Sequence, residues 1–274
     1  MTDYLGTAAG ARALLFVPGN RPDRFDKAAR AGADLVILDL EDAVAPADKD
    51  GARQEVASWL AAGSRACVRI NAAGTRWHRA DLAALRETEG VVAVVLPMAD
   101  DAEVLTAVHR AAGVPVIALV ETARGVVRAA QLAAAPGVVR LAFGALDLAV
   151  DLESEDPGTA DLVRRQLVLA SRAAGLRGPI DSVTPTVTDP GLAGREATDA
   201  RSLGMRGKLC IHPGQVAPVL AAFRPAPSEI DWAQRVLTAG AVEGVTVLDG
   251  QMVDAPVLER ARRILASVEG SVHE

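Results

Sequence analysis

The stretch "LVILDLEDAV", residues 35–44, predicts the fold of this chain. It opens with Leu and β-branched residues in an unbroken apolar run, which is typical of a parallel strand covered on both faces. It then runs into Asp39, Glu41 and Asp42. Three neighbouring carboxylates repel one another and resist burial. An acidic end on a buried strand therefore indicates a site where a bound cation offsets that repulsion.

Apolar runs of the same kind recur along the chain at intervals of mostly about 20 to 40 residues, the length of one βα unit. They cover residues 13–17, 35–40, 67–70, 91–97, 114–121, 138–147, 179–183 and 208–211. Between them lie stretches of helical period. In residues 21–32, Phe25, Ala28 and Ala29 share one face, and residues 100–113 begin with Asp100 and Asp101.

Eight strands joined by helical crossovers predict a closed (β/α)8 TIM barrel, an α/β fold for which 274 residues are ample. The alternative is an open doubly wound sheet, which carries a Gly-rich turn after its first strand. Here "PGNRPDR" follows that strand, and neither GxGxxG nor GxxxxGK[ST] occurs. We expect the barrel over residues 1–224 and a C-terminal helical extension over residues 225–274, serving as a lid or an oligomer contact.

The composition excludes several classes of partner. The formal net charge is −6, which argues against nucleic acid and against a polybasic membrane contact. No basic segment followed by a long apolar one opens the sequence, and no apolar run approaches the ~18 residues of a membrane helix. The two cysteines, Cys67 and Cys210, lie in apolar runs and are expected to be buried, reduced thiols. These features predict a cytoplasmic protein.

In a barrel of this type, functional side chains collect where the strands end. Strand alternation places Asp39 and Glu41 on one face, with Asp42 on the other. The same rule puts Arg69 and Asn71 on one face. The guanidinium of Arg69 suits a carboxylate clamp, but it equally suits a buried ion pair with one of these acids.

Glu121 and Asp147 each end a long apolar run and so stand at the mouth of the predicted barrel. Mg2+ prefers one or two carboxylates, with waters and substrate oxygens completing its shell. Asp39 and Glu41 would then accept hydrogen bonds from metal-bound waters. The alternative is that Glu121 and Asp147 are helix caps. Spacing alone leaves both interpretations open.

Two other polar residues are weaker candidates. His212 precedes a proline and is expected to be a hydrogen-bonded loop residue rather than a base. Lys208 is the only lysine near the end of a predicted strand. A Schiff-base aldolase is therefore poorly supported.

The chain resembles the citrate lyase beta-chain-like CoA-ester lyases of the HpcH/HpaI aldolase/citrate lyase family. The motifs that carry the resemblance occur in family order and span nearly the whole chain. They are "LLFVPGNRPDRFDKAA", "DLVILDLEDAV", "VRINAAGT", "VIALVETARGV", "FGALDLAVDL", "KLCIHPGQV" and "DGQMVDAPVLERARRIL". They are highly specific for the family and much less specific for the substrate.

The resemblance implies a TIM barrel, in a homotrimer or hexamer, that uses Mg2+, or alternatively Mn2+, to cleave or form a carbon–carbon bond beside a thioester. It implies that Glu121 and Asp147 bind the metal and that Arg69 is catalytic and, with Glu121, contacts the keto acid. Gly144 and Ala145 match substrate-binding positions. Asp39 and Glu41, already singled out by their place on the strand, join the expected substrate site.

The resemblance also implies a CoA site and a residue from the tail. Phe16 and Lys27 match positions that touch CoA, and the neighbouring Arg24 is assigned to the same site. Asp254 matches the catalytic aspartate of a lid that enters a neighbouring subunit's site in relatives. From the residues alone, Asp254 is instead the N-cap of the helix that follows it.

The expected activity is therefore a Mg2+-dependent carbon–carbon lyase acting on a 3-hydroxyacyl-CoA, such as malyl-, citramalyl- or citryl-CoA, with a 2-keto acid and an acyl-CoA as products. Three alternatives stay open: a citrate lyase beta subunit acting on a carrier-protein thioester, a CoA-independent metal aldolase, and a non-catalytic subunit that binds acyl-CoA. Leu146 stands where relatives commonly carry an acid, so the sequence does not fix the acyl group or the keto acid.

Overall fold

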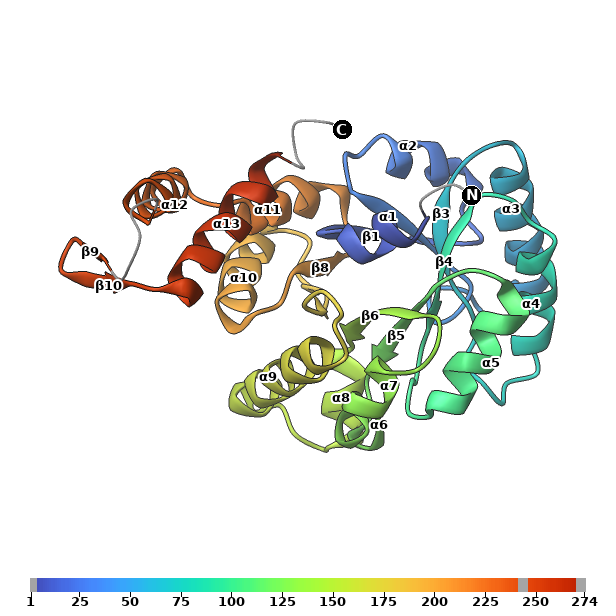
Figure 1. The fold of residues 1–274 in the computed structure, drawn as a ribbon. Helices are drawn as coiled ribbons and strands as arrows, with labels where there is room; N and C mark the ends of the chain where they lie inside the picture. The colour runs from blue at the N-terminus through green and yellow to red at the C-terminus, as the bar shows by residue number, and fades with distance from the viewer. Residues whose placement is uncertain (1–3, 241–245, 270–274) are drawn as a thin grey trace. The chain divides into compact units, whose positions relative to one another are not determined.

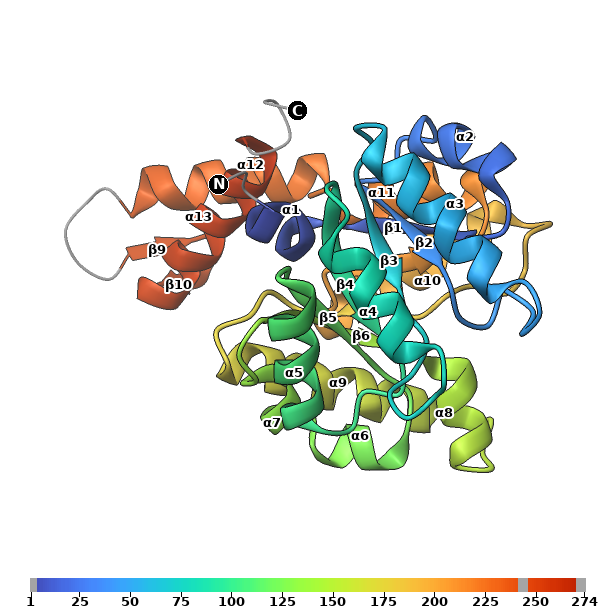
Figure 2. The same cartoon turned by 90° about the vertical axis from the view of Figure 1, so that its right-hand side faces the viewer.

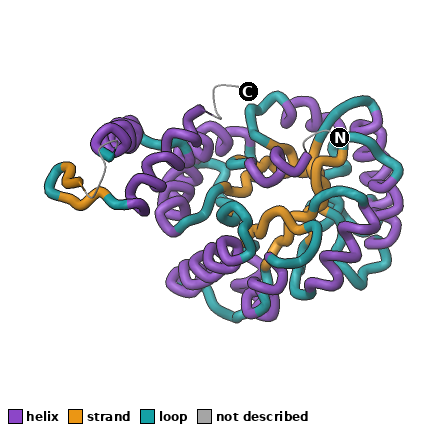
Figure 3. Tube along the Cα trace, viewed as in Figure 1, coloured by secondary structure: helices purple, strands orange, loops and turns teal. Residues whose placement is uncertain are grey.

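The computed structural model describes residues 4–240 and 246–269, and eight of its strands form a closed parallel barrel ringed by helices (Figures 1 and 3). The (β/α)8 prediction is confirmed. The barrel strands, in order around the barrel, are β1 (Ala13–Pro18), β2 (Leu35–Asp39), β3 (Ala66–Arg69), β4 (Val91–Leu96), β5 (Val116–Val120), β6 (Val138–Phe143), β7 (Ile180–Asp181) and β8 (Gly207–Cys210).

Most of the helices lie around the outside of the barrel, as the view turned by 90° also shows (Figure 2), whereas the first helix precedes β1 and packs against β4 and β6, with Ala8 in the barrel core. They are α1 (Tyr4–Gly10), the 3-10 turn η1 (Pro22–Arg24), α2 (Phe25–Ala29), α3 (Lys49–Ala61), α4 (His78–Arg86), α5 (Ala102–Ala112), α6 (Ala123–Val127), α7 (Ala129–Ala133), α8 (Ala145–Asp151), α9 (Pro157–Ala173), α10 (Pro190–Leu203) and α11 (Pro213–Phe223).

Local sequence signals explain where several of these helices begin and end. The Asp101 carboxylate accepts hydrogen bonds from two backbone N–H groups of α5, and Gly113 ends that helix with φ of 72°. The helix predicted over residues 21–32 is shorter than expected, because it is split into η1 and α2. Phe25 and Ala28 are buried as predicted, but Ala29 is exposed, so the predicted apolar face was wrong there.

The barrel interior is filled by alternate residues of the strands, as the period of two requires. The apolar cluster inside the barrel includes four almost completely buried residues, which are Leu14, Ile37, Cys67 and Ile117. Cys67 and Cys210 are both buried and free, as the sequence predicted. The barrel closes where Leu14 of β1 pairs with Leu209 of β8.

The strand register decides which polar residues meet at the carboxyl end of the barrel. Asp39, the last residue of β2, pairs with Arg69, the last residue of β3. Val120 of β5 pairs with Phe143 of β6 in the same way. The residues that follow these pairs therefore emerge side by side, and this end of the barrel carries the acidic side chains picked out from the sequence.

A second compact unit covers residues 222–274, three residues upstream of the boundary expected from the sequence. It contains α12 (Pro227–Ala239), the hairpin β9 (Thr246–Leu248) and β10 (Gln251–Val253), and α13 (Ala255–Glu269). Ala233, Val236, Val253 and Ala261 form its own small core. None of the helices described is both long and apolar enough to cross a membrane.

Candidate active site

Arg69 is the centre of the acidic cluster at the ends of β2 and β3. Its Nε and Nη2 each donate to one carboxylate oxygen of Asp39 over 2.7 Å, which is a bidentate pair. Its Nη1 lies 2.9 Å from Oε2 of Glu41 and donates to Oδ2 of Asp42 over 3.3 Å. The Phe16 ring covers the guanidinium, with the Cζ atom 4.9 Å from the ring centroid.

This geometry corrects two expectations from the sequence. The cation that offsets the repulsion among the three acids is Arg69 itself, so the ion-pair interpretation of Arg69 is confirmed. Asp42 does not point away from Asp39, because β2 ends at Asp39 and strand alternation no longer applies beyond it. The backbone N–H groups of Glu41 and Ala43 donate to Asp39 and fold the chain back over Arg69.

Glu41 is the least satisfied member of this cluster. Its Oε2 is close to Arg69 Nη1 but is buried without accepting a hydrogen bond, so the contact between them is electrostatic only. Burial raises the pKa of Glu41 to about 8, and the charges of Asp42 and Glu121 add to the rise. The nearby Arg69 opposes the shift but does not cancel it.

Sequence reasoning missed Lys49, which shapes the same loop. Its Nζ donates to the backbone carbonyls of Leu40 and Glu41 over 2.9 and 2.8 Å, and it lies 5.0 Å from the centre of the Trp77 ring. Lys49 thereby fixes the backbone that carries Glu41. No sequence signal marks it, because a lysine at the start of a helix is ordinarily a solvated residue.

Glu121 is almost fully buried, with 3% of its surface exposed, and follows β5 directly. The backbone N–H of Met98 donates to its Oε1 over 2.7 Å. Burial, together with the charge of Asp147, raises the pKa of Glu121 to about 7. Glu121 is not the cap of α6, because Thr122 occupies that position and its hydroxyl accepts from the Gly125 N–H. The capping alternative for Glu121 was therefore wrong.

Gly144, Ala145 and Asp147 lie together at the start of α8. Gly144 is its N-cap residue, and the Ala145 N–H donates to the Ser182 hydroxyl over 3.0 Å. Asp147 lies in the first turn, is exposed and caps no backbone group, so the capping alternative fails here too. The Gly144 backbone at the start of this helix lies against the Glu121 side chain, and the charge of Asp147 adds to the rise in the pKa of Glu121.

This carboxylate pair suits a hard divalent cation. Oε1 of Glu121 is held by a backbone N–H, while Oε2 accepts no hydrogen bond from any described residue. Burial, and to a lesser extent the charge of Asp147, disfavours the ionised form of Glu121, and a cation beside Oε2 would offset both effects. Within residues 4–240 and 246–269 no three His, Cys, Asp or Glu side chains form a closed metal cage. The pair is therefore suited to an ion whose shell is completed by water and substrate oxygens.

Three polar residues considered from the sequence belong to other networks. Asn71 turns away from Arg69, because its backbone and side-chain nitrogens both donate to buried Asp81. His212 is an exposed loop residue whose Nδ1 accepts from the Gly214 N–H, as expected. Lys208 is buried and its Nζ contacts Asp181 over 3.1 Å. Within this ion pair it offers no free amine, so the expectation against a Schiff base agrees with the geometry.

The residues assigned to CoA and to the lid lie in separate parts of the chain. Arg24 and Lys27 are exposed on η1 and α2, whereas Phe16 is only partly exposed and packs against the barrel interior. In the second unit, Asp254 accepts from the Val257 N–H over 3.1 Å and is the N-cap of α13. The helix-cap interpretation of Asp254 is confirmed, and its catalytic role stays a prediction.

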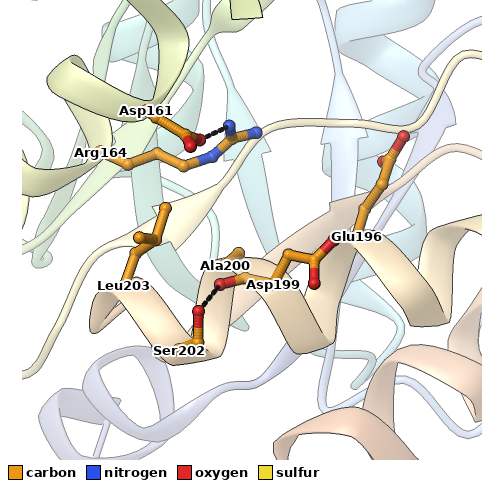
Figure 4. A pocket seen from close by; sticks show the side chains of 7 residues that line it. All are labelled: Asp161, Arg164, Glu196, Asp199, Ala200, Ser202 and Leu203. Carbon is orange, nitrogen blue, oxygen red and sulfur yellow. Dashed lines mark hydrogen bonds and ion pairs between the residues drawn. The ribbon is translucent and has the colours of Figure 1, made fainter. Parts of the chain in front are cut away.

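A surface pocket lies elsewhere, between α9 and α10 (Figure 4). Arg164 on its wall is paired with Asp161 over 3.0 Å and with buried Asp181 over 2.7 Å. Glu196, also in its lining, is paired with Lys208 over 3.2 Å. The pocket contains none of the predicted site residues. Its lining consists of Asp161, Arg164, Glu196, Asp199, Ala200, Ser202 and Leu203.

Comparison with known proteins agrees with this geometry. A curated relative is the citrate lyase subunit beta-like protein of Mycobacterium tuberculosis, 43% identical over 92% of this chain and 93% of its own length. A (3S)-malyl-CoA thioesterase of Cereibacter sphaeroides is 34% identical, covering 94% of each chain. The crystal structure of M. tuberculosis CitE with magnesium, acetoacetate and coenzyme A superposes with a TM-score of 0.85 at 40% identity, covering 95% of this chain and 99% of that one.

The sequence model of the HpcH/HpaI aldolase/citrate lyase family matches residues 12–213. This range includes all eight barrel strands and every barrel residue of the candidate site. The barrel, the order of its motifs and the paired carboxylates at its carboxyl end therefore lead to one conclusion: the chain belongs to the HpcH/HpaI aldolase/citrate lyase family and is an enzyme of its lyase type.

Proposed function

We propose that the protein is a Mg2+-dependent lyase that cleaves, or in reverse forms, the carbon–carbon bond of a 3-hydroxyacyl-CoA such as malyl-, citramalyl- or citryl-CoA. The observation that carries the proposal is the buried Glu121 carboxylate at the carboxyl end of the barrel, whose Oε2 is free as an acceptor, together with Asp147 in the first turn of α8. The related CitE, crystallised with magnesium, acetoacetate and coenzyme A, supports the assignment.

Glu121 and Asp147 would hold the Mg2+, with Mn2+ as an alternative ion. When bound, such an ion lowers the pKa of a coordinated hydroxyl and polarises a carbonyl. Gly144 and Ala145 would face the substrate from the start of α8, beside these two carboxylates. Arg69, held by Asp39 and Glu41, would present its positive charge to the carboxylate of the keto acid.

The cleavage balances without an added oxidant or reductant. The substrate hydroxyl loses its proton and becomes the carbonyl of the 2-keto acid. The carbon–carbon bond breaks at the same time, and its electron pair goes to the α-carbon of the thioester. The α-carbon of that thioester then takes up a proton. Asp254 is our candidate donor, entering from a neighbouring subunit of a homotrimer or hexamer.

The CoA moiety would lie along the exposed basic side chains of η1 and α2. Arg24 and Lys27 carry charges that suit its phosphates. Phe16, which covers the Arg69 guanidinium, would lie between the thioester end and the acidic cluster. The cytoplasmic location and the absence of nucleic-acid and membrane partners stay predictions from the sequence.

Thioester hydrolysis is a second candidate, because relatives named (3S)-malyl-CoA thioesterase align with 94% of this chain. A carrier-protein thioester, a free hydroxy-keto acid and a purely acyl-CoA-binding role are further alternatives. Each predicts a different product or a different substrate requirement, so one assay separates them.

The test is a panel of 3-hydroxyacyl-CoA thioesters incubated with Mg2+ or with EDTA and analysed by mass spectrometry. Lyase activity yields a 2-keto acid and a shortened acyl-CoA, and only with Mg2+. Release of free CoA and an intact hydroxy acid would show hydrolysis instead. Turnover of the free hydroxy-keto acid, or only of a carrier-protein thioester, would identify those alternatives, and unchanged thioesters across the whole panel would overturn the proposal.

A further inference from the structure

We propose that Met98 and Gly144 are positioning residues for the reaction, which together fix the Glu121 carboxylate so that only Oε2 is presented to the ion. The inference rests on the metal site of the proposed function and assigns two residues a further role, that of orienting a metal-binding side chain. Met98 supplies a backbone N–H to Oε1, and Gly144 leaves room beside Oε2.

The position of the Met98 N–H follows from how β4 is pinned to β5. Leu96, the last residue of β4, pairs with Ala118, and three residues later the Ala99 N–H donates to the carbonyl of Leu119 over 3.0 Å. The Val94 N–H likewise donates to Pro115, the residue before its register partner Val116, so Ala99 stands opposite Val120. Three residues after β4 therefore advance against two residues of β5, which leaves one extra residue. The extra chain at Pro97 and Met98 protrudes as a turn, which takes the Met98 N–H out of the strand ladder.

At this position Met98 adopts an unfavourable backbone conformation. Its φ is 52°, in the left-handed region that side chains other than Gly, Asn and Asp rarely adopt. Two other described non-Gly residues share it, but Asp249 lies in a hairpin turn and Glu153 follows the end of α8. Met98 lies at neither kind of position. A strained residue that bonds a buried carboxylate at the mouth of a barrel indicates a functional constraint.

Gly144 constrains the other side of Glu121. A Cβ atom at this position would lie 2.4 Å from Oε2 and 2.6 Å from the Cβ of Glu121, closer than real Cβ contacts allow. The Gly144 N–H is bonded to the carbonyl of Val120, so the backbone cannot retreat without breaking the β5–β6 edge. Any larger residue would have to displace the carboxylate.

The two contacts act on different atoms of one group. The Met98 N–H fixes Oε1, and the missing Cβ of Gly144 leaves the space in which Oε2 and the Cβ of Glu121 lie. A carboxylate held in one orientation binds an ion without first losing rotational freedom, which is why partners of metal ligands affect metal affinity strongly.

The test measures Mn2+ binding to the substrate-free enzyme by the electron paramagnetic resonance signal of free Mn2+. We expect Gly144→Ala to weaken binding about 10- to 100-fold, the usual range for loss of a ligand's partner. Met98→Val should weaken it similarly, since a β-branched residue disfavours positive φ even more than Met does. Met98→Gly and Met98→Asn tolerate that φ and should restore binding to near the wild-type value. Gly51→Ala, with nothing within 4 Å of the added methyl group, is the matched control.

The outcomes separate this inference from the proposed function. If Glu121→Gln abolishes Mn2+ binding while Gly144→Ala and Met98→Val bind normally, the positioning roles are wrong and the metal site stands. If Met98→Gly is as impaired as Met98→Val, the Met98 side chain matters and not its backbone. If the wild-type enzyme binds no Mn2+, or Glu121→Gln binds it equally well, the metal site and the inference both fail. Should Gly144→Ala misfold, the Met98 series decides alone.

Discussion

Replacing Arg69 by Met tests whether this guanidinium holds the acidic cluster together. The substitution keeps most of the side-chain volume and removes the charge. It leaves Asp39, which is 1% exposed, without its bidentate partner, and it leaves Glu41 and Asp42 facing each other with no cation between them. The folded state should therefore be destabilised, because a buried charge that loses its partner is costly.

The magnitude follows from the contacts. Breaking a buried ion pair by removing one partner costs about 3–5 kcal/mol. Asp39 retains two backbone donors, the N–H groups of Glu41 and Ala43, over 2.9 and 3.1 Å. We therefore expect Arg69→Met to lower the free energy of unfolding by about 3 kcal/mol, the lower end of that range. Arg69→Lys keeps the positive charge but loses the bidentate guanidinium geometry, and should lower the free energy of unfolding by about 1–2 kcal/mol.

The assay is urea unfolding followed by far-ultraviolet circular dichroism in EDTA, with the slope of the transition compared among variants. Arg195→Met is the control, because Arg195 pairs with Asp189 over 2.7 Å but both side chains are more than half exposed. An exposed pair of that kind is worth about 0–1 kcal/mol. The double variant Asp39→Asn/Arg69→Met should recover part of the loss, since the unpaired carboxylate is then absent.

Two results would refute the reasoning. Arg69→Met could unfold at the same urea concentration as Arg195→Met, which would show that the cluster is solvated and not held by Arg69. Alternatively, the losses in the double variant could add without any recovery, which would show that Arg69 and Asp39 are not coupled. In either case Arg69 would be free to act as a substrate clamp alone.

The remaining predictions concern the metal, CoA, pH and the second unit. Glu121→Gln and Asp147→Asn should fold normally yet lose Mg2+-dependent turnover, and full activity of either variant in EDTA would contradict the metal assignment. Lys27→Glu should raise the KM for a CoA thioester and leave Mn2+ binding unchanged; an unaltered KM removes Lys27 from the CoA site. Because burial raises the pKa of Glu41 to about 8, the folded state holds a proton that the unfolded state has lost, so stability should fall as pH rises from 5 to 8, by up to about 1.4 kcal/mol per unit from this group. Glu41→Gln should make that dependence shallower in urea titrations, with the buried Glu121, whose pKa is raised to about 7, keeping its own contribution below that pH, and an identical slope would refute the buried, protonated state of Glu41. Asp254→Ala should lose turnover, and mixing it with Glu121→Gln subunits should restore part of it if the site is shared between subunits, whereas a helix cap alone predicts a loss of about 1 kcal/mol in stability and no restoration.

The sequence by itself determined the architecture. The eight apolar runs, spaced by one βα unit, predicted the barrel. A parallel strand that is buried on both faces requires consecutive apolar residues, so a short stretch of sequence is enough to reveal it. Local capping signals worked for the same reason: Asp101 and Gly113 bound α5, and Asp254 caps α13, through contacts only a few residues apart. The motifs that identified the family are also local stretches, and Glu121 directly follows β5 as they predicted. The apolar run expected to end at Asp147 was too long, because β6 ends at Phe143 and Asp147 lies in the first turn of α8.

Only the tertiary structure decided which of these residues meet, because partners are chosen by strand register and by turns that have no periodicity. Asp42 joins Arg69 since the chain folds back after Asp39, against the alternation expected from the sequence. Asn71 is drawn to Asp81 on α4 instead of facing the site. Met98 takes a left-handed conformation because β4 carries excess chain where it is pinned to β5. The orientation of the Glu121 carboxylate is thus set by residues distant in sequence, whose contribution exists only once the barrel is closed.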